Sequence, residues 1–182
     1  MFRRLLVAFD GSAHSQRALD EAIELARANR GTVTVMTVAP EPSRLWSVGR
    51  GYGDPLNVDG VGDQVERQYQ SMLDGALHSV PADVRITGNL KRGAAAPALI
   101  EEADTRDHDL IVMGSRGHGE LRSLLLGSVS HHVLQASRIP VLVIPVAADD
   151  ETSASPSEPR ARSRTTPHDE RPPSNGMPTA IL

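Results

Sequence analysis

Short apolar runs alternate with longer amphipathic stretches along most of this chain. The runs are rich in Val, Ile and Leu and have the length of strands, whereas apolar residues at helical spacing separate them. The predicted strands are residues 5–9, 32–38, 83–90, 110–113 and 141–144. The predicted helices are residues 12–30, 64–79, 97–103 and 128–137, with a long loop over residues 39–62. Strands that alternate with helices predict an α/β fold, in which a parallel sheet carries helices on both faces.

A glycine-rich turn follows the fourth predicted strand. Gly114 ends the apolar run, Gly117 follows three positions later, and Gly127 with Ser128 precedes the next predicted helix. Glycines reach positive φ and let the backbone approach a ligand closely, while the first turn of a helix attracts anions. Arg116 adds a forked donor that suits phosphate. The turn predicts a phosphate-binding site, although many glycine-rich turns between strands and helices hold no ligand.

Asp10 follows the first predicted strand in the same way that Gly114 follows the fourth. In parallel α/β sheets, ligands bind beyond the carboxyl ends of strands, where the direction of the strand order reverses. If the first and fourth strands are neighbours, Asp10 and Gly114 share one crevice. Asp10 also has a simpler interpretation, as a cap for the helix that follows it.

Composition narrows the functional classes. The chain has 182 residues, a formal net charge of −4 and no Cys. A negative chain has no electrostatic footprint for non-specific nucleic-acid binding, and without Cys it has no disulfide or thiolate metal site. The apolar run after Arg4 is too short for a secretion signal, and no apolar stretch is long enough for a membrane span. We therefore expect a cytoplasmic protein that binds neither nucleic acid nor membrane.

Residues 148–182 differ in composition from the rest of the chain. They are rich in Pro, Ser and Thr, contain Arg160, Arg162 and Arg164, and have no aromatic residue. Such a segment cannot bury enough apolar surface to offset the entropy lost on ordering. We predict a folded domain over residues 1–147 and a disordered tail over residues 148–182.

The spacing Gly114-x2-Gly117-x9-Gly127-Ser128 resembles the nucleotide-binding motif of the universal stress protein family, in its ATP-binding branch. The opening LLVAFDGSAHSQRAL and the late segment VLVIP resemble other parts of that family. The resemblance covers about residues 4–146. It implies a Rossmann-like, adenine nucleotide alpha hydrolase-like fold with five strands in the order 3-2-1-4-5. It also implies ATP in the crevice between the first and fourth strands.

The resemblance further implies which residues hold the nucleotide. Asp10 would meet the ribose or the adenine, and Met113 would close the pocket beneath the base. The base would be lined by the backbone of Ala8, Phe9 and Val38. The ribose and phosphates would be held by Gly114, Arg116, Gly117, Gly127, Ser128, Val129 and Ser130, with Gly119 in the spacer of the motif. Family members often dimerise through the last strand, which would place residues 141–146 at a homodimer interface.

Three functions fit these features. The first is an ATP-binding module for stress response or signalling, in which the nucleotide is a ligand or a switch. The second is a slow Mg²⁺-dependent ATPase, and the third is a nucleotide-independent dimeric interaction protein in which the glycine turn is structural. No catalytic residue and no protein metal ligand is predicted. Asp10 is the nearest candidate for a general base, and it is expected at the other end of the nucleotide from the phosphates.

Overall fold

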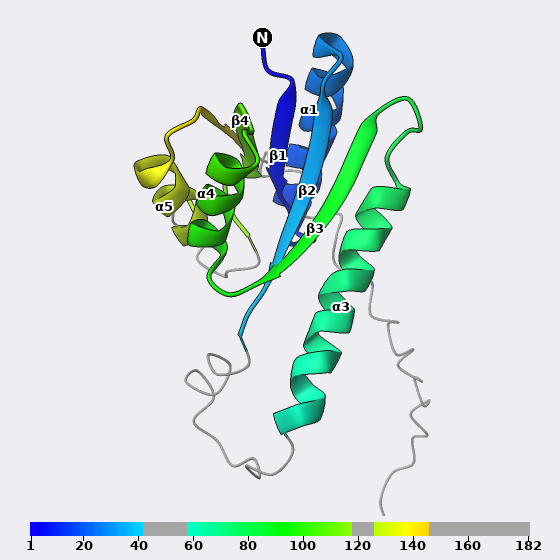
Figure 1. Cartoon of the computed structure of the whole chain (residues 1–182), viewed down its shortest axis with the longest axis vertical. Coiled ribbons are helices and arrows are strands. Elements are labelled where there is room, and N and C mark those ends of the chain that lie inside the picture. The colour runs from blue at the N-terminus through cyan, green and yellow to red at the C-terminus, as the bar shows by residue number, and fades with distance from the viewer. Residues whose placement is uncertain (42–57, 118–125, 146–182) are drawn as a thin grey trace, which may run out of the picture.

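A five-stranded parallel sheet forms the centre of the part of the molecule that the structure describes (Figure 1). The computed structural model describes residues 1–41, 58–117 and 126–145. The strands are β1 (Arg4–Ala8), β2 (Thr32–Ala39), β3 (Arg85–Arg92), β4 (Leu110–Gly114) and β5 (Val141–Ile144). The helices are α1 (Ala13–Asn29), α3 (Val58–His78), α4 (Ala95–Thr105) and α5 (Ser128–Ala136). The strand order is β3-β2-β1-β4-β5, which confirms the predicted fold and topology.

Alternate residues of the inner strands pack against opposite layers of helices. In β1, Leu5 and Val7 belong to the apolar cluster on the side of α1 and α3, whereas Leu6 belongs to the cluster on the side of α4 and α5. β4 is buried along its whole length. Because helices cover both faces, these strands are continuous apolar runs in the sequence. β3 lies at the sheet edge with one side toward α3, so its apolar residues alternate with polar ones.

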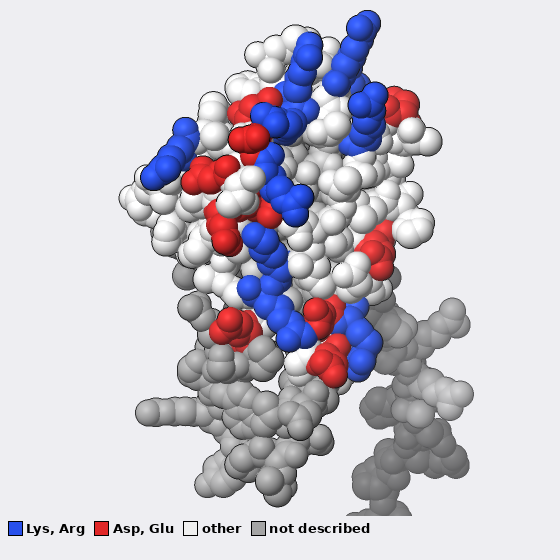
Figure 2. Space-filling view, viewed as in Figure 1, with Lys and Arg blue, Asp and Glu red and all other residues white. Residues whose placement is uncertain are grey.

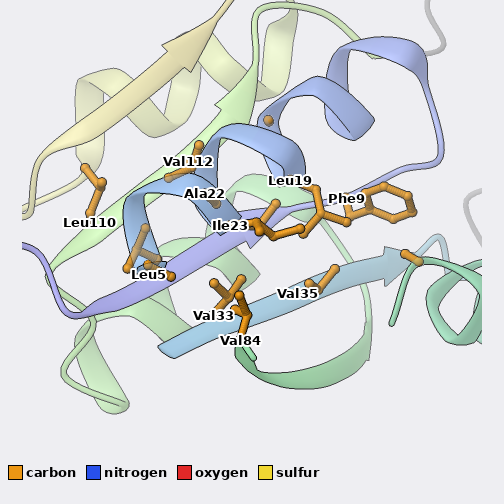
Figure 3. Close-up of a cluster of buried hydrophobic side chains, with 14 of the residues drawn as sticks. Leu5, Phe9, Leu19, Ala22, Ile23, Val33, Val35, Val84, Leu110 and Val112 are labelled. Carbon is orange, nitrogen blue, oxygen red and sulfur yellow. The ribbon is translucent and has the colours of Figure 1, made fainter. Parts of the chain in front are cut away.

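The larger apolar cluster lies between the sheet and α1 (Figure 3). Leu19, Ala22 and Ile23 of α1 have the i, i+3, i+4 spacing that places side chains on one helix face. They pack over Leu5 and Val112 of the central strands. Burial of a Leu side chain contributes about 1.5–3 kcal/mol, so this face of α1 suffices to hold the helix on the sheet.

Residues at both ends of α1 fix its limits. Ser12 is the N-cap, and its hydroxyl oxygen accepts a hydrogen bond from the Ser15 N–H at 3.2 Å. At the other end Arg30 has the left-handed conformation, with φ 52°. Gly31 follows it, and a Cβ there would lie 2.7 Å from the carbonyl oxygen of Arg3.

The boundaries of α3, β3 and α4 differ from the predictions by two residues or more, and α4 extends two residues beyond its predicted range at each end. α3 begins at Val58, so residues 58–62 of the predicted loop are helical. Glycine costs only about 1 kcal/mol per residue in a helix, which the continuing turns of α3 offset. β3 begins two residues late, because a turn in which the Val84 N–H donates to the Pro81 carbonyl at 3.1 Å occupies its predicted start. The rest of the predicted loop and the predicted tail lie outside the described residues.

Charged side chains of both signs are mixed on the face shown in Figure 2. Lys91 lies 3.1 Å from a carboxylate oxygen of Glu102, and Arg4 lies 3.6 Å from one of Asp107. On this face, basic side chains of the described residues run in a column with acidic side chains beside it. No helix in the described part of the chain is long and apolar enough to cross a membrane.

His108 connects the turn before β4 to β2. Its imidazole is only 8% exposed. Nε2 lies 3.1 Å from the Thr34 hydroxyl, and Nδ1 lies 3.3 Å from the carbonyl oxygen of Glu102. Burial lowers the pKa of His108, and the nearby carbonyl and carboxylate of Glu102 only partly oppose this effect. The folded protein therefore favours the neutral ring.

We expect the free energy of unfolding to decrease as the pH falls below about 6.5, the ordinary pKa of histidine. In that range the unfolded chain binds a proton that His108 resists in the folded state, so protonation favours unfolding. His108→Gln removes this contribution and should show a smaller difference in urea stability between about pH 7.5 and pH 5.5. His78 on α3 is exposed, so His78→Gln should keep the wild-type pH dependence. An equal pH dependence in the His108→Gln variant would contradict the assignment.

Candidate functional site

A cavity of about 670 Å³ lies beyond the carboxyl ends of β1, β2 and β4. β1 pairs with β2 on one side and with β4 on the other, so the strand order reverses at this point. Such a switch point is where parallel α/β sheets bind ligands. Asp10, after β1, and Gly114, at the end of β4, both line the cavity. The neighbouring strands thus bring these two residues into one crevice.

Twelve of the thirteen predicted site residues line this cavity, and Gly119 lies outside the described residues. The lining residues that were predicted are Ala8, Phe9, Asp10, Val38, Met113, Gly114, Arg116, Gly117, Gly127, Ser128, Val129 and Ser130. Those that sequence reasoning missed are Ser15, Met36, Ala95, Leu99, Leu126 and His131. Nothing in the sequence distinguishes the apolar residues among these from ordinary core residues. Ser15 lies in the opening segment that resembles the family but has no assigned role there, and His131 lies outside the glycine motif.

One part of the cavity has apolar walls. Met36 of β2 and Met113 of β4 line it, together with Leu99 of α4, and all three belong to the core cluster beneath α4 and α5. They are at most 3% exposed. A small cavity with closely packed apolar walls suits a flat, weakly polar ring.

Val38 adds a polar edge to this apolar part. The last backbone hydrogen bond between β2 and the chain that leaves β1 runs from the Phe9 N–H to the Met36 carbonyl, at 2.9 Å. The Ala39 carbonyl accepts a hydrogen bond from the Gly93 N–H, on the β3 side. Strand residues alternate in direction, so the N–H and C=O of Val38 point to the β1 side. Among the described residues no backbone group engages them there, so Val38 presents one donor and one acceptor to the cavity.

The opposite part of the cavity is formed where β4 meets the start of α5. The Gly127 N–H donates to the Ser115 carbonyl at 2.7 Å, and the Ser130 hydroxyl donates to the Gly114 carbonyl at 2.9 Å. The Ser130 hydroxyl proton is therefore already used within the protein. The N–H groups of the first turn of a helix have no intrahelical partner, and among the described residues no side chain caps those of α5. An uncapped first turn at a cavity is a site that attracts an anion.

Different physical reasons apply to the presence of glycine at the three motif positions, 114, 117 and 127. None of them is among the residues with positive φ in the described part of the chain, so the expectation of positive φ was wrong. A Cβ on Gly114 would lie 2.6 Å from the Cβ of His14, and a Cβ on Gly117 would collide with the Asp10 carboxylate. Gly127 has φ −72° and ψ 160°, which any residue adopts, and a Cβ there would meet no atom of the described residues closer than 3.4 Å. Packing explains Gly114 and Gly117 but not Gly127.

Asp10 is held in a fixed orientation at the cavity. Its Oδ1 accepts hydrogen bonds from the Ser12 N–H at 3.0 Å and the Ser12 hydroxyl at 2.6 Å. Ser12, rather than Asp10, caps α1. Asp10 is the one carboxylate among the described lining residues, whereas Arg116 and His131 are the basic side chains. The described residues contain no group of three or more His, Asp or Glu that could hold a metal ion.

A family model described as the universal stress protein family matches residues 1–145. Universal stress protein YxiE from Bacillus subtilis is 33% identical, in an alignment that covers 79% of this chain and 99% of the relative. The chain belongs to the universal stress protein family.

Two universal stress protein structures also resemble it. UspA from Lactobacillus plantarum aligns with a TM-score of 0.65 at 20% identity, covering 79% of this chain and 97% of UspA. A universal stress protein solved in complex with cAMP aligns with a TM-score of 0.51 at 26% identity, over 79% and 97% of the two chains.

The contact between Gly114 and His14 can be tested by stability measurements on this universal stress protein. Gly114→Ala places a Cβ against the backbone of α1, so we expect a loss of about 1–3 kcal/mol in the free energy of unfolding. Gly75 of α3 is a matched control, because a Cβ there meets nothing within 4 Å. Gly75→Ala should stabilise the protein by about 0.5–1 kcal/mol. Equal effects of the two substitutions in urea unfolding would show that α1 and β4 are not in close contact.

Proposed function

We propose that this chain is a cytoplasmic ATP-binding module that acts in stress response or signalling. The observation that carries the proposal is the start of α5 at the cavity, which no side chain of the described residues caps. Gly127 occupies the N-cap position without a steric or conformational need for glycine. Ser, Asp or Asn there would cap the helix but would also engage the N–H groups that an anion needs. A bound phosphate group explains why the position lacks a cap.

The apolar part of the cavity supports adenine as the base. Adenine carries an amino donor at its six-position, whereas guanine carries an oxygen acceptor there. The C=O of Val38 would accept from the adenine amino group, and the N–H of Val38 would donate to the adjacent ring nitrogen. Met36 and Met113 would enclose the ring between apolar surfaces. The family member solved in complex with cAMP supports an adenine nucleotide as well.

The polar part of the cavity supports a ligand with phosphate groups. Arg116 lines the cavity near the first turn of α5, where a Cβ on Gly127 would lie 3.4 Å from the Arg116 Cα. Backbone N–H groups of Ser128, Val129 and Ser130 would bind the phosphates together with the Arg116 guanidinium. Asp10 would contact the ribose from the opposite side, beyond β1.

ATP is proposed as a ligand rather than as a rapidly hydrolysed substrate. The only carboxylate among the described lining residues is Asp10, and Ser12 already engages its Oδ1. A Mg²⁺ ion, if one is bound, is proposed to be coordinated by the phosphates of the nucleotide itself. Steady-state phosphate release near the uncatalysed rate would support binding without turnover.

A homodimer through residues 141–146 is also proposed. β5 lies at the edge of the sheet, and its four apolar residues are all partly exposed. An apolar edge strand with unpaired backbone groups favours pairing with another strand. Residue 146 lies outside the described residues.

Substitutions at the start of α5 should separate binding from stability. Gly127→Asp caps the helix and places a negative charge at the proposed phosphate position, so ATP affinity should fall more than tenfold while the thermal stability is kept. Arg116→Ala should weaken ATP binding roughly tenfold through the loss of charge-assisted hydrogen bonds. Arg17 of α1 is exposed and does not line the cavity, so Arg17→Ala serves as the control. Unchanged calorimetric affinity in the Gly127→Asp and Arg116→Ala variants would refute the site.

The wild-type protein should also prefer ATP to GTP. Guanine would oppose an acceptor to the Val38 carbonyl and a donor to the Val38 N–H, leaving buried polar groups unpaired at a cost of about 1–3 kcal/mol each. We expect at least a tenfold difference between the two dissociation constants, measured by calorimetry under the same conditions. Equal affinities would show that Val38 does not contact the base.

A further inference from the structure

His131 lines the cavity although it lies outside the glycine motif. It is three positions after Ser128, the first residue of α5, so the two side chains share one face of the helix. Helical side chains lean toward the N-terminus of their own helix, which directs the imidazole over the first turn. His132, the next residue, is not among the described lining residues. The structure therefore distinguishes two adjacent histidines by their position relative to the cavity.

Gln135, one turn further along α5, contacts one ring nitrogen of His131. The amide nitrogen of Gln135 lies 3.4 Å from His131 Nε2. An amide nitrogen donates, so Nε2 is the acceptor in this contact and the neutral ring carries its proton on Nδ1. No group among the described residues engages the other ring nitrogen, Nδ1. The side chain of His131 is exposed, so Nδ1 retains its capacity to hydrogen-bond with a molecule in the cavity.

The surroundings of His131 favour a negatively charged group. The first turn of α5 contributes uncapped N–H groups and the positive end of the helix dipole. Arg116 is the other basic side chain of the cavity lining. Asp10, the carboxylate among the described lining residues, follows β1 rather than α5. A ligand anion at the first turn would thus lie between two basic side chains from different elements.

We infer that His131 donates a hydrogen bond to the phosphate groups of the bound nucleotide, and that Gln135 positions its ring for this contact. The inference rests on the proposed nucleotide site and adds a ligand-contacting residue to it. The contact involves the phosphate part of the ligand alone, so it contributes to the binding of ATP but not of adenosine.

The test compares ATP with adenosine in calorimetric titrations of the full chain. His131→Ala should weaken ATP binding about three- to tenfold, the range expected for one hydrogen bond, and leave adenosine binding unchanged. His132→Ala is the matched control and should change neither affinity. His131→Arg keeps a donor at the same position and should keep ATP affinity close to that of the wild type. Gln135→Ala should cause a smaller loss for ATP than His131→Ala.

Two results would overturn the inference while leaving the nucleotide site intact. One is an unchanged affinity for both ATP and adenosine in His131→Ala. The other is an equal loss for both ligands, which would mean that His131 shapes the pocket without touching phosphate. If the wild-type protein binds neither ATP nor adenosine, the proposed function and this inference both fail. His131 is exposed, so its substitution should leave the fold intact, and a circular dichroism spectrum of each variant checks this.

Discussion

Hydrogen bonds from Gly127 and Ser130 join the start of α5 to the end of β4, and the cavity depends on them. The Gly127 N–H donates to the Ser115 carbonyl, and the Ser130 hydroxyl donates to the Gly114 carbonyl. β4 is buried along its whole length, so the core fixes its position. The two bonds transmit that rigidity to the first turn of α5, since a buried polar group left without its partner costs about 1–3 kcal/mol. These bonds therefore tie the start of the helix to the sheet.

The apolar part of the cavity is an extension of the protein core. Met36, Leu99 and Met113 are buried residues of the cluster beneath α4 and α5, and each also lines the cavity. A flat ring in this position would continue the packing of that cluster, so the same residues that stabilise the fold would bind the ligand. This dual use explains why the pocket walls are rigid before any ligand enters, which reduces the entropy lost on binding.

Most of the fold could be predicted from the sequence, because apolar periodicity reports strands and helices directly. The strand order came from the resemblance, and the pairing of β1 with β4 bears it out. The start of α3 was missed because glycines look like loop residues, and the start of β3 was missed because its turn involves a backbone bond. His131 was missed because its role depends on which face of α5 meets the cavity. The reason for Gly114 was misjudged, since its contact with His14 joins segments about a hundred residues apart in the sequence.

The exposure of the Val38 backbone N–H and C=O to the cavity depends on how β1 ends. Asp10 accepts two hydrogen bonds from Ser12, and Gly11 between them has φ 82°, which glycine adopts without strain. This turn directs the chain away from β2 and into α1. The backbone hydrogen bonds to β2 therefore stop after the one from the Phe9 N–H to the Met36 carbonyl. Had β1 continued for two more residues, its backbone would have paired with Val38 and filled the crevice. A polar turn after β1 thus exposes the donor and acceptor on β2, while the glycine motif shapes the opposite end of the same cavity.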